Sequence, residues 1–206
     1  MKKAMHKVSA LYLLAKAAKI LYLCYHKTVK IQVVNDAVAP DSPSQEAAYS
    51  YVFWHAKTFL ILPQYRGLQI GVLTMLDSKN LFYDKLCGLL GYQTIPVTSG
   101  MRAAIRLKTL LEAGFHTGIA VDGPKGPVGI IRPGALYLSQ KTNRPIVAMK
   151  VTCEKSFRIR SRWDQYEVPY PFSKASIFLS QPMQVNKDNW PKIEEKIKEF
   201  LGDYKS

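Results

Sequence analysis

Apolar runs of strand length alternate with segments of helical spacing along most of this chain, and no other feature of the sequence restricts its fold as strongly. The strand-like runs cover residues 48–53, 69–76, 92–97, 116–121, 145–152 and 175–179. The helical segments cover residues 56–65, 81–90, 100–112, 135–141 and 190–204. This alternation predicts an α/β fold with a mainly parallel central sheet flanked by helices. Functional residues of such sheets lie at the carboxyl ends of the strands.

The N-terminal region differs in character, and its pattern predicts one helix over residues 8–30. The apolar and aromatic face of this helix carries Leu11, Leu14, Ala18, Leu21, Tyr22 and Tyr25. The other side carries Lys16, Lys19, Lys27 and Lys30. A cationic amphipathic helix of this kind suits a membrane interface, and the alternative is a core-packing helix with its lysines in solvent. We predict a membrane-association helix over residues 1–35 and one globular domain over residues 36–206.

Neither a membrane span nor a cleaved signal peptide is predicted. A membrane span needs about 20 apolar residues, and the uncharged stretch at residues 67–76 has only ten. Near the N-terminus, Lys16 and Lys19 interrupt the apolar stretch at residues 8–15 too early for a signal peptide.

The chain is strongly basic, with 29 Lys and Arg against 15 Asp and Glu among 206 residues, which gives a net charge of +14. Between residues 101 and 162, basic residues outnumber acidic ones twelve to three. This excess favours an anionic partner, either nucleic acid or an anionic membrane surface, unless it only keeps the protein solvated. The three cysteines are far apart and lack C-x-x-C spacing, so the sequence predicts neither a disulfide framework nor a zinc site.

Four chemically capable features follow predicted strands. His55 follows the first strand, Asp77 the second, Ser99 and Arg102 the third, and Asp122 the fourth. A histidine titrates near neutral pH, so His55 is a candidate general base, with a structural histidine as the alternative. Ser99 offers a nucleophile, but the G-x-S-x-G elbow of α/β-hydrolases is absent. No histidine or carboxylate spacing proposes a metal site.

The string D-G-P-K-G-P at residues 122–127 is the most unusual segment of the chain. Gly123 and Gly126 permit dihedral angles that other residues avoid, and the two prolines stiffen the loop. Lys125 and the backbone N–H groups of such a loop are suited to an anion. Arg132 follows closely, and arginine binds phosphate through its planar guanidinium. The alternative is a tight structural turn with no ligand.

Together these motifs match a known family. The matching segments are Trp54-His55, residues 122–127, Pro133-Gly134 with Leu138, residues 161–173 (S-R-W-D-Q-Y-E-V-P-Y-P-F-S) and Gln181-Pro182. Over residues 51–183 the chain resembles the DUF374 group of the lysophospholipid acyltransferase-like superfamily, which includes short secondary acyltransferases of lipid A.

Some positions depart from the family pattern. The superfamily generally uses a His-x-x-x-x-Asp dyad, but the fifth residue after His55 is Leu60. The family segment Ser-x-x-x-Asp-Gly matches Asp77 only with a shift, and its R-G-S-S reads P-V-T-S here, so Arg102 is the candidate replacement for its arginine. Asp77 and Asp122 therefore both remain candidates for the acid that orients His55.

The resemblance implies an acyltransferase-like domain over residues 36–206. Its activity would move a fatty acyl group from an acyl carrier protein or coenzyme A thioester to a hydroxyl of a lipid A precursor or lysophospholipid. His55 would be the base, with Asp122 or Asp77 beside it. Substrate and phosphate would be bound by Ser99, Arg102, Gly123, Lys125, Gly126 and Arg132.

The same resemblance implies no metal or other cofactor and no nucleic-acid partner. It places the protein peripherally on an anionic membrane surface, at the cytoplasmic face of the inner membrane, with a membrane lipid as acceptor. The alternative function is a non-catalytic protein of the same fold that binds lipid or docks on membranes.

Overall fold

The computed structural model describes residues 2–43, 47–75, 81–97 and 100–203. Its helices are α1 (Lys2–His26), α2 (Thr58–Gln64), α3 (Leu81–Leu89), α4 (Gly100–Glu112), α5 (Gly134–Thr142) and α6 (Trp190–Leu201), with short 3₁₀ turns η1 (Asp36–Val38) and η2 (His55–Lys57). Its strands are β1 (Lys30–Val34), β2 (Ser50–Phe53), β3 (Gly71–Met75), β4 (Gln93–Val97), β5 (Thr117–Ala120), β6 (Ile146–Cys153), β7 (Ser156–Arg158), β8 (Glu167–Pro169) and β9 (Lys174–Leu179).

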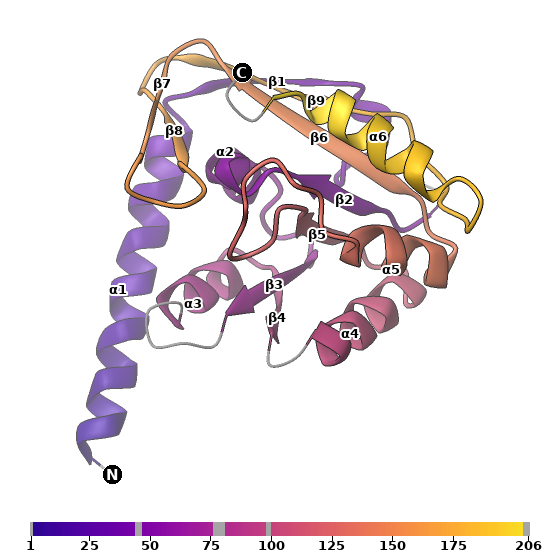
Figure 1. Ribbon diagram of the computed structural model, residues 1–206. Helices are drawn as coiled ribbons and strands as arrows, with labels where there is room; N and C mark the ends of the chain where they lie inside the picture. The colour runs from indigo at the N-terminus through magenta and orange to yellow at the C-terminus, as the bar shows by residue number, and fades with distance from the viewer. Residues whose placement is uncertain (1, 44–46, 76–80, 98–99, 204–206) are drawn as a thin grey trace.

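Seven of these strands form one sheet in the order β1-β9-β6-β2-β5-β3-β4, which Figure 1 shows across the centre of the molecule. Five of its six neighbouring pairs are parallel, and only β6 and β9 run antiparallel. The predicted α/β fold with a mainly parallel sheet is therefore confirmed. The remaining strands, β7 and β8, form a separate antiparallel hairpin, which the sequence pattern did not predict.

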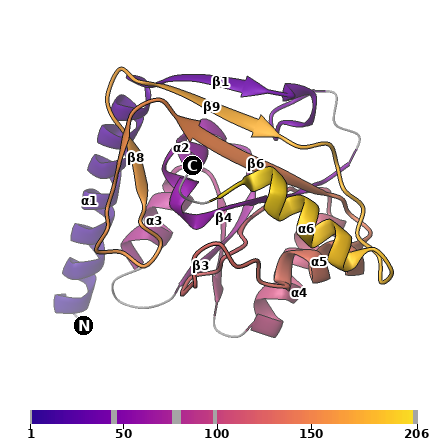
Figure 2. The same cartoon turned by 45° about the horizontal axis from the view of Figure 1, so that its top comes forward.

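Helices cover both faces of the sheet because successive strand residues point to opposite sides. In β2, Val52 packs into a core cluster with α4, α5 and α6. Its neighbours Tyr51 and Phe53 pack into a second cluster with α2, α3 and the C-terminal part of α1. Figure 2 shows the sheet between these two sets of helices. The sheet is thus buried on both sides around β2, the strand that leads to His55.

The N-terminal helix ends earlier than predicted, because residues 30–34 form a strand of the sheet. Strand β1 pairs in parallel with β9 at the edge of the sheet, with Lys30 opposite Lys174. Ile31 and Val33 contact the core, whereas Lys30 and Gln32 are exposed. This two-residue alternation is the period of a strand, and it is too short to stand out from the helical pattern before it.

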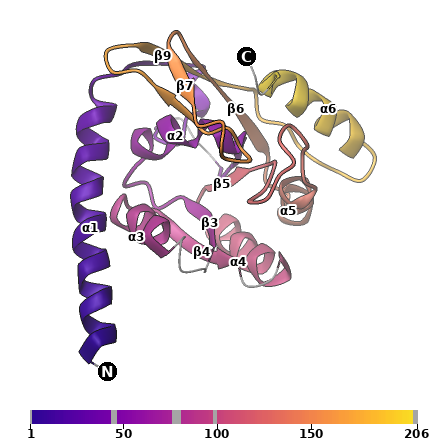
Figure 3. The same ribbon diagram turned by 60° about the vertical axis from the view of Figure 1, so that its left-hand side comes forward.

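Helix α1 packs on the body of the protein along one side only. Ala15 is buried, the Lys19 ammonium donates a hydrogen bond to the Leu89 carbonyl at 2.6 Å, and the Tyr25 hydroxyl donates one to the Pro169 carbonyl at 2.6 Å. Figure 3 shows the N-terminal turns extending past the other helices. Lys19 therefore lies on the packed side, contrary to the predicted lysine face.

The outward side of α1 is apolar. Leu14 and Leu21, predicted on the same face as Leu11, are 60% and 71% exposed, and Leu13 and Ile20 are exposed beside them. Cys24 is also exposed, whereas Cys87 is buried. Among the helices that the structure describes, none is long and apolar enough to span a membrane.

Leu111 and Leu21 provide a test of this packing. Leu111 is fully buried on α4, so Leu111→Ala should lower the free energy of unfolding by about 2–5 kcal/mol. Leu21→Ala removes a side chain that solvent already contacts, and its effect should stay within about 0.5 kcal/mol. Urea denaturation followed by circular dichroism measures both. Equal losses would show that Leu21 belongs to the core.

Candidate active site

The carboxyl ends of the central strands bring two predicted residues together. His55 lies two residues beyond the end of β2, and Asp122 lies two residues beyond the end of β5, the neighbour of β2 in the sheet. Arg102 lies in the first turn of α4, which begins three residues after β4 ends. Asp77 and Ser99 lie outside the described residues.

The carboxylate that contacts the His55 ring belongs to Asp164, which was not among the predicted site residues. His55 Nδ1 and Asp164 Oδ2 are 2.7 Å apart. Asp164 is fully buried, and its position in the loop between β7 and β8 carries it across to the end of β2. Among the described residues, the acid that contacts the His55 ring is therefore Asp164 and not Asp122.

Arg162 holds the same carboxylate from its other side. Its Nε donates to Asp164 Oδ1 at 2.9 Å and its NH2 group donates to Oδ2 at 2.8 Å, which is the forked pairing that guanidinium and carboxylate favour. The guanidinium also lies over the Tyr166 ring, 5.0 Å from its centroid. Burial alone raises the pKa of Asp164, but the hydrogen bonds from His55 and Arg162 outweigh it and hold that pKa well below its usual range. The carboxylate therefore stays ionised beside the imidazole.

Asp122 acts on the backbone of His55 instead of its ring. The His55 backbone N–H donates to Asp122 Oδ1 at 3.0 Å, which fixes the turn that begins at the end of β2. Asp122 is fully buried, and its Oδ2 has no hydrogen-bond partner among the described residues. Burial raises the pKa of Asp122, partly offset by the hydrogen bond from His55. Asp122 thus lies beside His55 but contacts its backbone N–H and not its ring.

A second buried ion pair connects the β7–β8 hairpin to the His55 turn. Lys57 Nζ and Glu167 Oε2 are 2.8 Å apart, and both side chains are almost completely buried. Arg158 approaches the same carboxylate oxygen at 3.2 Å, and the Ser156 hydroxyl donates to the other at 3.1 Å. Burial by itself raises the pKa of Glu167, but Lys57 and Arg158 lower it further than burial raises it. The hairpin that carries Asp164 is therefore fixed at two charged points.

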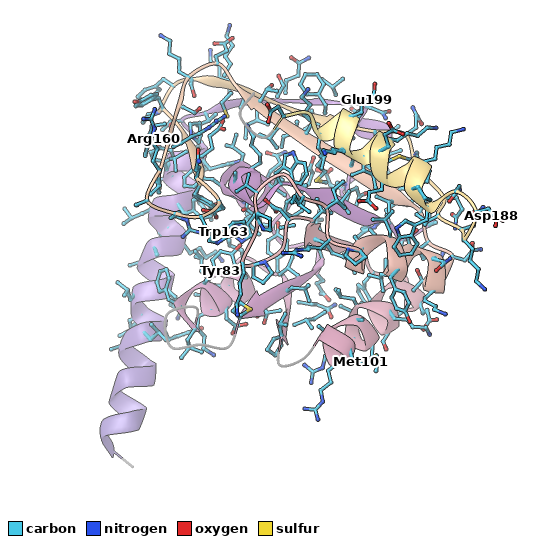
Figure 4. All side chains as sticks on the ribbon, viewed as in Figure 1. Tyr83, Met101, Arg160, Trp163, Asp188 and Glu199 are labelled. Carbon is cyan, nitrogen blue, oxygen red and sulfur yellow. The ribbon has the colours of Figure 1, made fainter. Side chains whose placement is uncertain are left out.

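Trp163 closes the space between His55 and the D-G-P-K-G-P loop. Its ring centroid lies 5.2 Å from that of His55. A Cβ on Gly126 would come within 2.7 Å of the Trp163 ring, so only glycine permits this close approach. Figure 4 shows Trp163 beside the loop that follows β5. Packing against an aromatic ring is one reason for the second glycine of the motif.

The other predicted binding residues lie on the same loop. Arg132 is exposed and donates a hydrogen bond through its guanidinium to the Gly126 carbonyl, and Lys125 is exposed beside it. The Gly123 N–H donates to the Ala120 carbonyl at 3.1 Å, so this amide supports the turn. Of the two glycines considered for binding an anion or oxyanion, the Gly126 amide therefore remains the better candidate.

The sequence did contain a signal for the missed residues. Arg162, Trp163 and Asp164 lie within the S-R-W-D-Q-Y-E segment that carries part of the family resemblance. That segment has no regular periodicity, so its proximity to His55 follows only from the folded hairpin. Among the described residues, no group of three or more His, Cys, Asp or Glu side chains is arranged to hold a metal ion.

Comparisons with known proteins bear on the fold. No family model matches the chain. An uncharacterized protein of Rickettsia prowazekii is 25% identical over 169 residues, which cover 78% of this chain and 76% of that protein. The crystal structure of the 1-acyl-sn-glycerophosphate acyltransferase PlsC from Thermotoga maritima matches 91% of this chain and 78% of its own, with a TM-score of 0.58 and 13% sequence identity. The chain has the fold of this acyltransferase.

Leu60 occupies the position of the acid in a His-x-x-x-x-Asp dyad. Leu60 lies on α2 and is 2% exposed, packed in the core cluster that α2 and α3 share. A carboxylate there would be buried among apolar side chains at high cost. In this chain the acid reaches His55 from the hairpin instead. Membership of the DUF374 group remains a prediction.

Asp164→Asn tests whether the ionised Asp164 carboxylate stabilises the fold through His55 and Arg162. A depressed pKa means that the ionised carboxylate stabilises the fold above its ordinary pKa of about 4, and that this contribution disappears as the pH falls toward the folded value. The substitution should cost about 1–3 kcal/mol at neutral pH, and the difference from the wild-type protein should shrink near pH 3. Urea denaturation at both pH values measures this.

Asp188→Asn is the matched control, because Asp188 is an exposed acid in the loop before α6. It should change stability little at either pH. A cost for Asp164→Asn that grows in acid would contradict the assigned ion pair.

Proposed function

We propose that this protein is an acyltransferase that moves a fatty acyl group from an acyl thioester to a hydroxyl group of a membrane lipid. The observation that carries the proposal is the contact between His55 Nδ1 and the buried, ionised Asp164 carboxylate. This pair lies at the carboxyl edge of a sheet whose fold is shared with a known acyltransferase. A histidine oriented by a carboxylate is the arrangement needed to remove a proton from a hydroxyl group.

The geometry gives the imidazole a defined role. When Nδ1–H donates to Asp164, Nε2 is left as the proton acceptor of the neutral ring. The acceptor hydroxyl gives its proton to Nε2 while its oxygen attacks the thioester carbonyl. The new C–O bond forms, the C–S bond breaks, and the thiolate leaves with the proton from the imidazolium. The negative charge of Asp164 stabilises that imidazolium, and the Arg162 guanidinium keeps Asp164 from taking the proton itself.

The loop beside His55 provides groups that could stabilise the oxyanion and bind a substrate phosphate. We assign the Gly126 amide to the oxyanion that forms on the thioester carbonyl, since preorganised backbone N–H groups stabilise such charge. Lys125 and Arg132 are exposed on the same loop and suit the phosphate of the acceptor or donor. The favoured acceptors are a lipid A precursor or a lysophospholipid, and the donor is an acyl carrier protein or coenzyme A thioester.

We further propose that the outward side of α1 holds the enzyme peripherally on an anionic membrane surface, at the cytoplasmic face of the inner membrane. Leu13, Leu14, Ile20 and Leu21 are all at least 60% exposed on that helix. Moving one methylene group out of water is favourable by about 0.8 kcal/mol of transfer free energy, so these side chains favour the bilayer interface over solution. Lys16 and Lys27 are exposed at the margin of this side and suit anionic headgroups.

His55→Ala tests the chemistry. Acyl transfer to a lysophospholipid, measured with radiolabelled acyl thioester, should fall by about 10²–10⁴-fold because the general base is lost. His116→Ala is the matched control, since His116 accepts a hydrogen bond from the Tyr49 backbone at the start of β5 and lies away from the site. A folded His55→Ala protein with full activity would show that His55 is not the general base, whereas a wild-type protein without acyl transfer would favour the non-catalytic lipid-binding function.

Leu14→Ala together with Leu21→Ala tests the role of α1. This double variant should weaken sedimentation with phosphatidylglycerol vesicles about tenfold, and it should reduce activity on a membrane acceptor more than on a short-chain soluble acceptor. Point substitutions are preferable to deleting residues 1–30, because deletion would also remove Tyr22 and Tyr25, which bond to the body of the protein. Unchanged sedimentation would overturn the assignment.

A further inference from the structure

Helix α4 presents a second apolar and cationic surface to solvent. Ala103, Leu107 and Leu111 are buried against the sheet. On the opposite side, Met101 is 71% exposed and Ile105 is 55% exposed. Arg102 and Arg106 are exposed next to them, each one residue further along. Residues four apart are neighbours on a helix surface, so these four side chains form one continuous patch over the first two turns, which we call the α4 face.

The position of the α4 face relates it to the active site. Helix α4 starts three residues after β4 ends, so its first turns lie at the carboxyl edge of the sheet. His55 and Asp122 lie at the same edge. Figure 4 shows Met101 at the lower edge of the body of the protein, and the N-terminal turns of α1 extend further in the same direction in Figures 1 and 3. The α4 face and the N-terminal part of α1 are therefore on the same side as the site.

The first two turns of α4 carry only positive charge. Glu112 is the only acidic residue of α4, it lies at the far end of the helix, and it accepts a hydrogen bond from Lys108 at 2.6 Å. The first two turns thus combine two apolar side chains with two arginines and no acid. Arginine pairs with phosphate through its guanidinium fork, and Met and Ile gain free energy on entering the acyl region.

We propose that the α4 face is a second point of contact with a bilayer that contains anionic lipid. This inference rests on the proposed function, because it gives α1 and α4 a common membrane plane and turns the carboxyl edge of the sheet toward it. A protein partner is disfavoured, since a stable protein interface buries at least about 1,200 Å² and this patch offers only two apolar side chains. A bilayer needs no such continuous area, because separate insertion points add their binding energies.

Met101→Ala combined with Ile105→Ala tests the proposal on the full chain. The partition coefficient onto phosphatidylglycerol-containing phosphatidylcholine vesicles, measured by sedimentation, should fall about tenfold. Phe172→Ala is the matched control. Phe172 is 82% exposed, but its N–H bonds to Thr28 just beyond the C-terminal end of α1, away from the proposed plane. If Phe172→Ala weakens binding and the α4 variant does not, the membrane faces another side and the proposal is wrong.

Arg106→Gln separates charge from apolar insertion. Binding to vesicles with phosphatidylglycerol should weaken about fivefold, and binding to pure phosphatidylcholine vesicles should not change. Loss of binding to duplex DNA, with vesicle binding unchanged, would instead indicate a nucleic-acid surface and overturn the proposal.

Acyl transfer to a short-chain soluble acceptor distinguishes this inference from the proposed function. The Met101 and Ile105 double variant should retain that activity while losing vesicle binding. If the wild-type protein shows no acyl transfer but binds vesicles through the α4 face, the chemistry is wrong and the contact stands. If transfer is present and the double variant binds vesicles normally, the contact is wrong and the chemistry stands.

Discussion

The 2.7 Å contact between His55 Nδ1 and Asp164 Oδ2 joins residues 109 positions apart in the sequence, and the rest of the site depends on it. It requires that β2 end beside β5, so that the Asp122 carboxylate fixes the His55 backbone. It also requires that the β7–β8 hairpin fold back over the turn after β2. An ionised carboxylate in a fully buried position is stable only with such partners, which is why Arg162 pairs with both of its oxygens.

The hairpin is positioned by polar and charged contacts together with aromatic ones, since Trp163 lies against His55 and Tyr166 against Phe59. Lys57 and Glu167 form one of these contacts, and the Tyr25 hydroxyl on the Pro169 carbonyl forms another. The second contact comes from the C-terminal part of α1. The same helix that offers an apolar side to solvent therefore also supports the strand next to the segment that carries Asp164. Helix α1 therefore links the proposed membrane contact to the orientation of His55.

The parallel strands of the sheet explain why the His55 site and the α4 face lie at the same edge of the sheet. Strands β6, β2, β5, β3 and β4 run parallel to one another and end at the same edge of the sheet. The turn at His55, the loop at Asp122 and the start of α4 therefore all lie at that edge. Met101 and Ile105 are exposed at this edge, and the proposed function requires an acyl chain to leave the bilayer there. A fold that needed loops from both ends of the sheet would not give this coincidence.

Local patterns in the sequence determined the alternation of strands and helices, the loop at residues 122–127 and the position of His55 after a strand, because periodicity and glycine–proline spacing act over a few residues. Only the tertiary structure decided which acid meets His55. Asp122 belongs to the more specific sequence motif, but its carboxylate accepts a hydrogen bond from the His55 backbone. Asp164, which contacts the His55 ring, lies in a hairpin segment whose sequence has no regular periodicity. The same holds for α1, whose residues are apolar nearly all round, so that packing alone selected Ala15 for the core and left Leu21 in solvent.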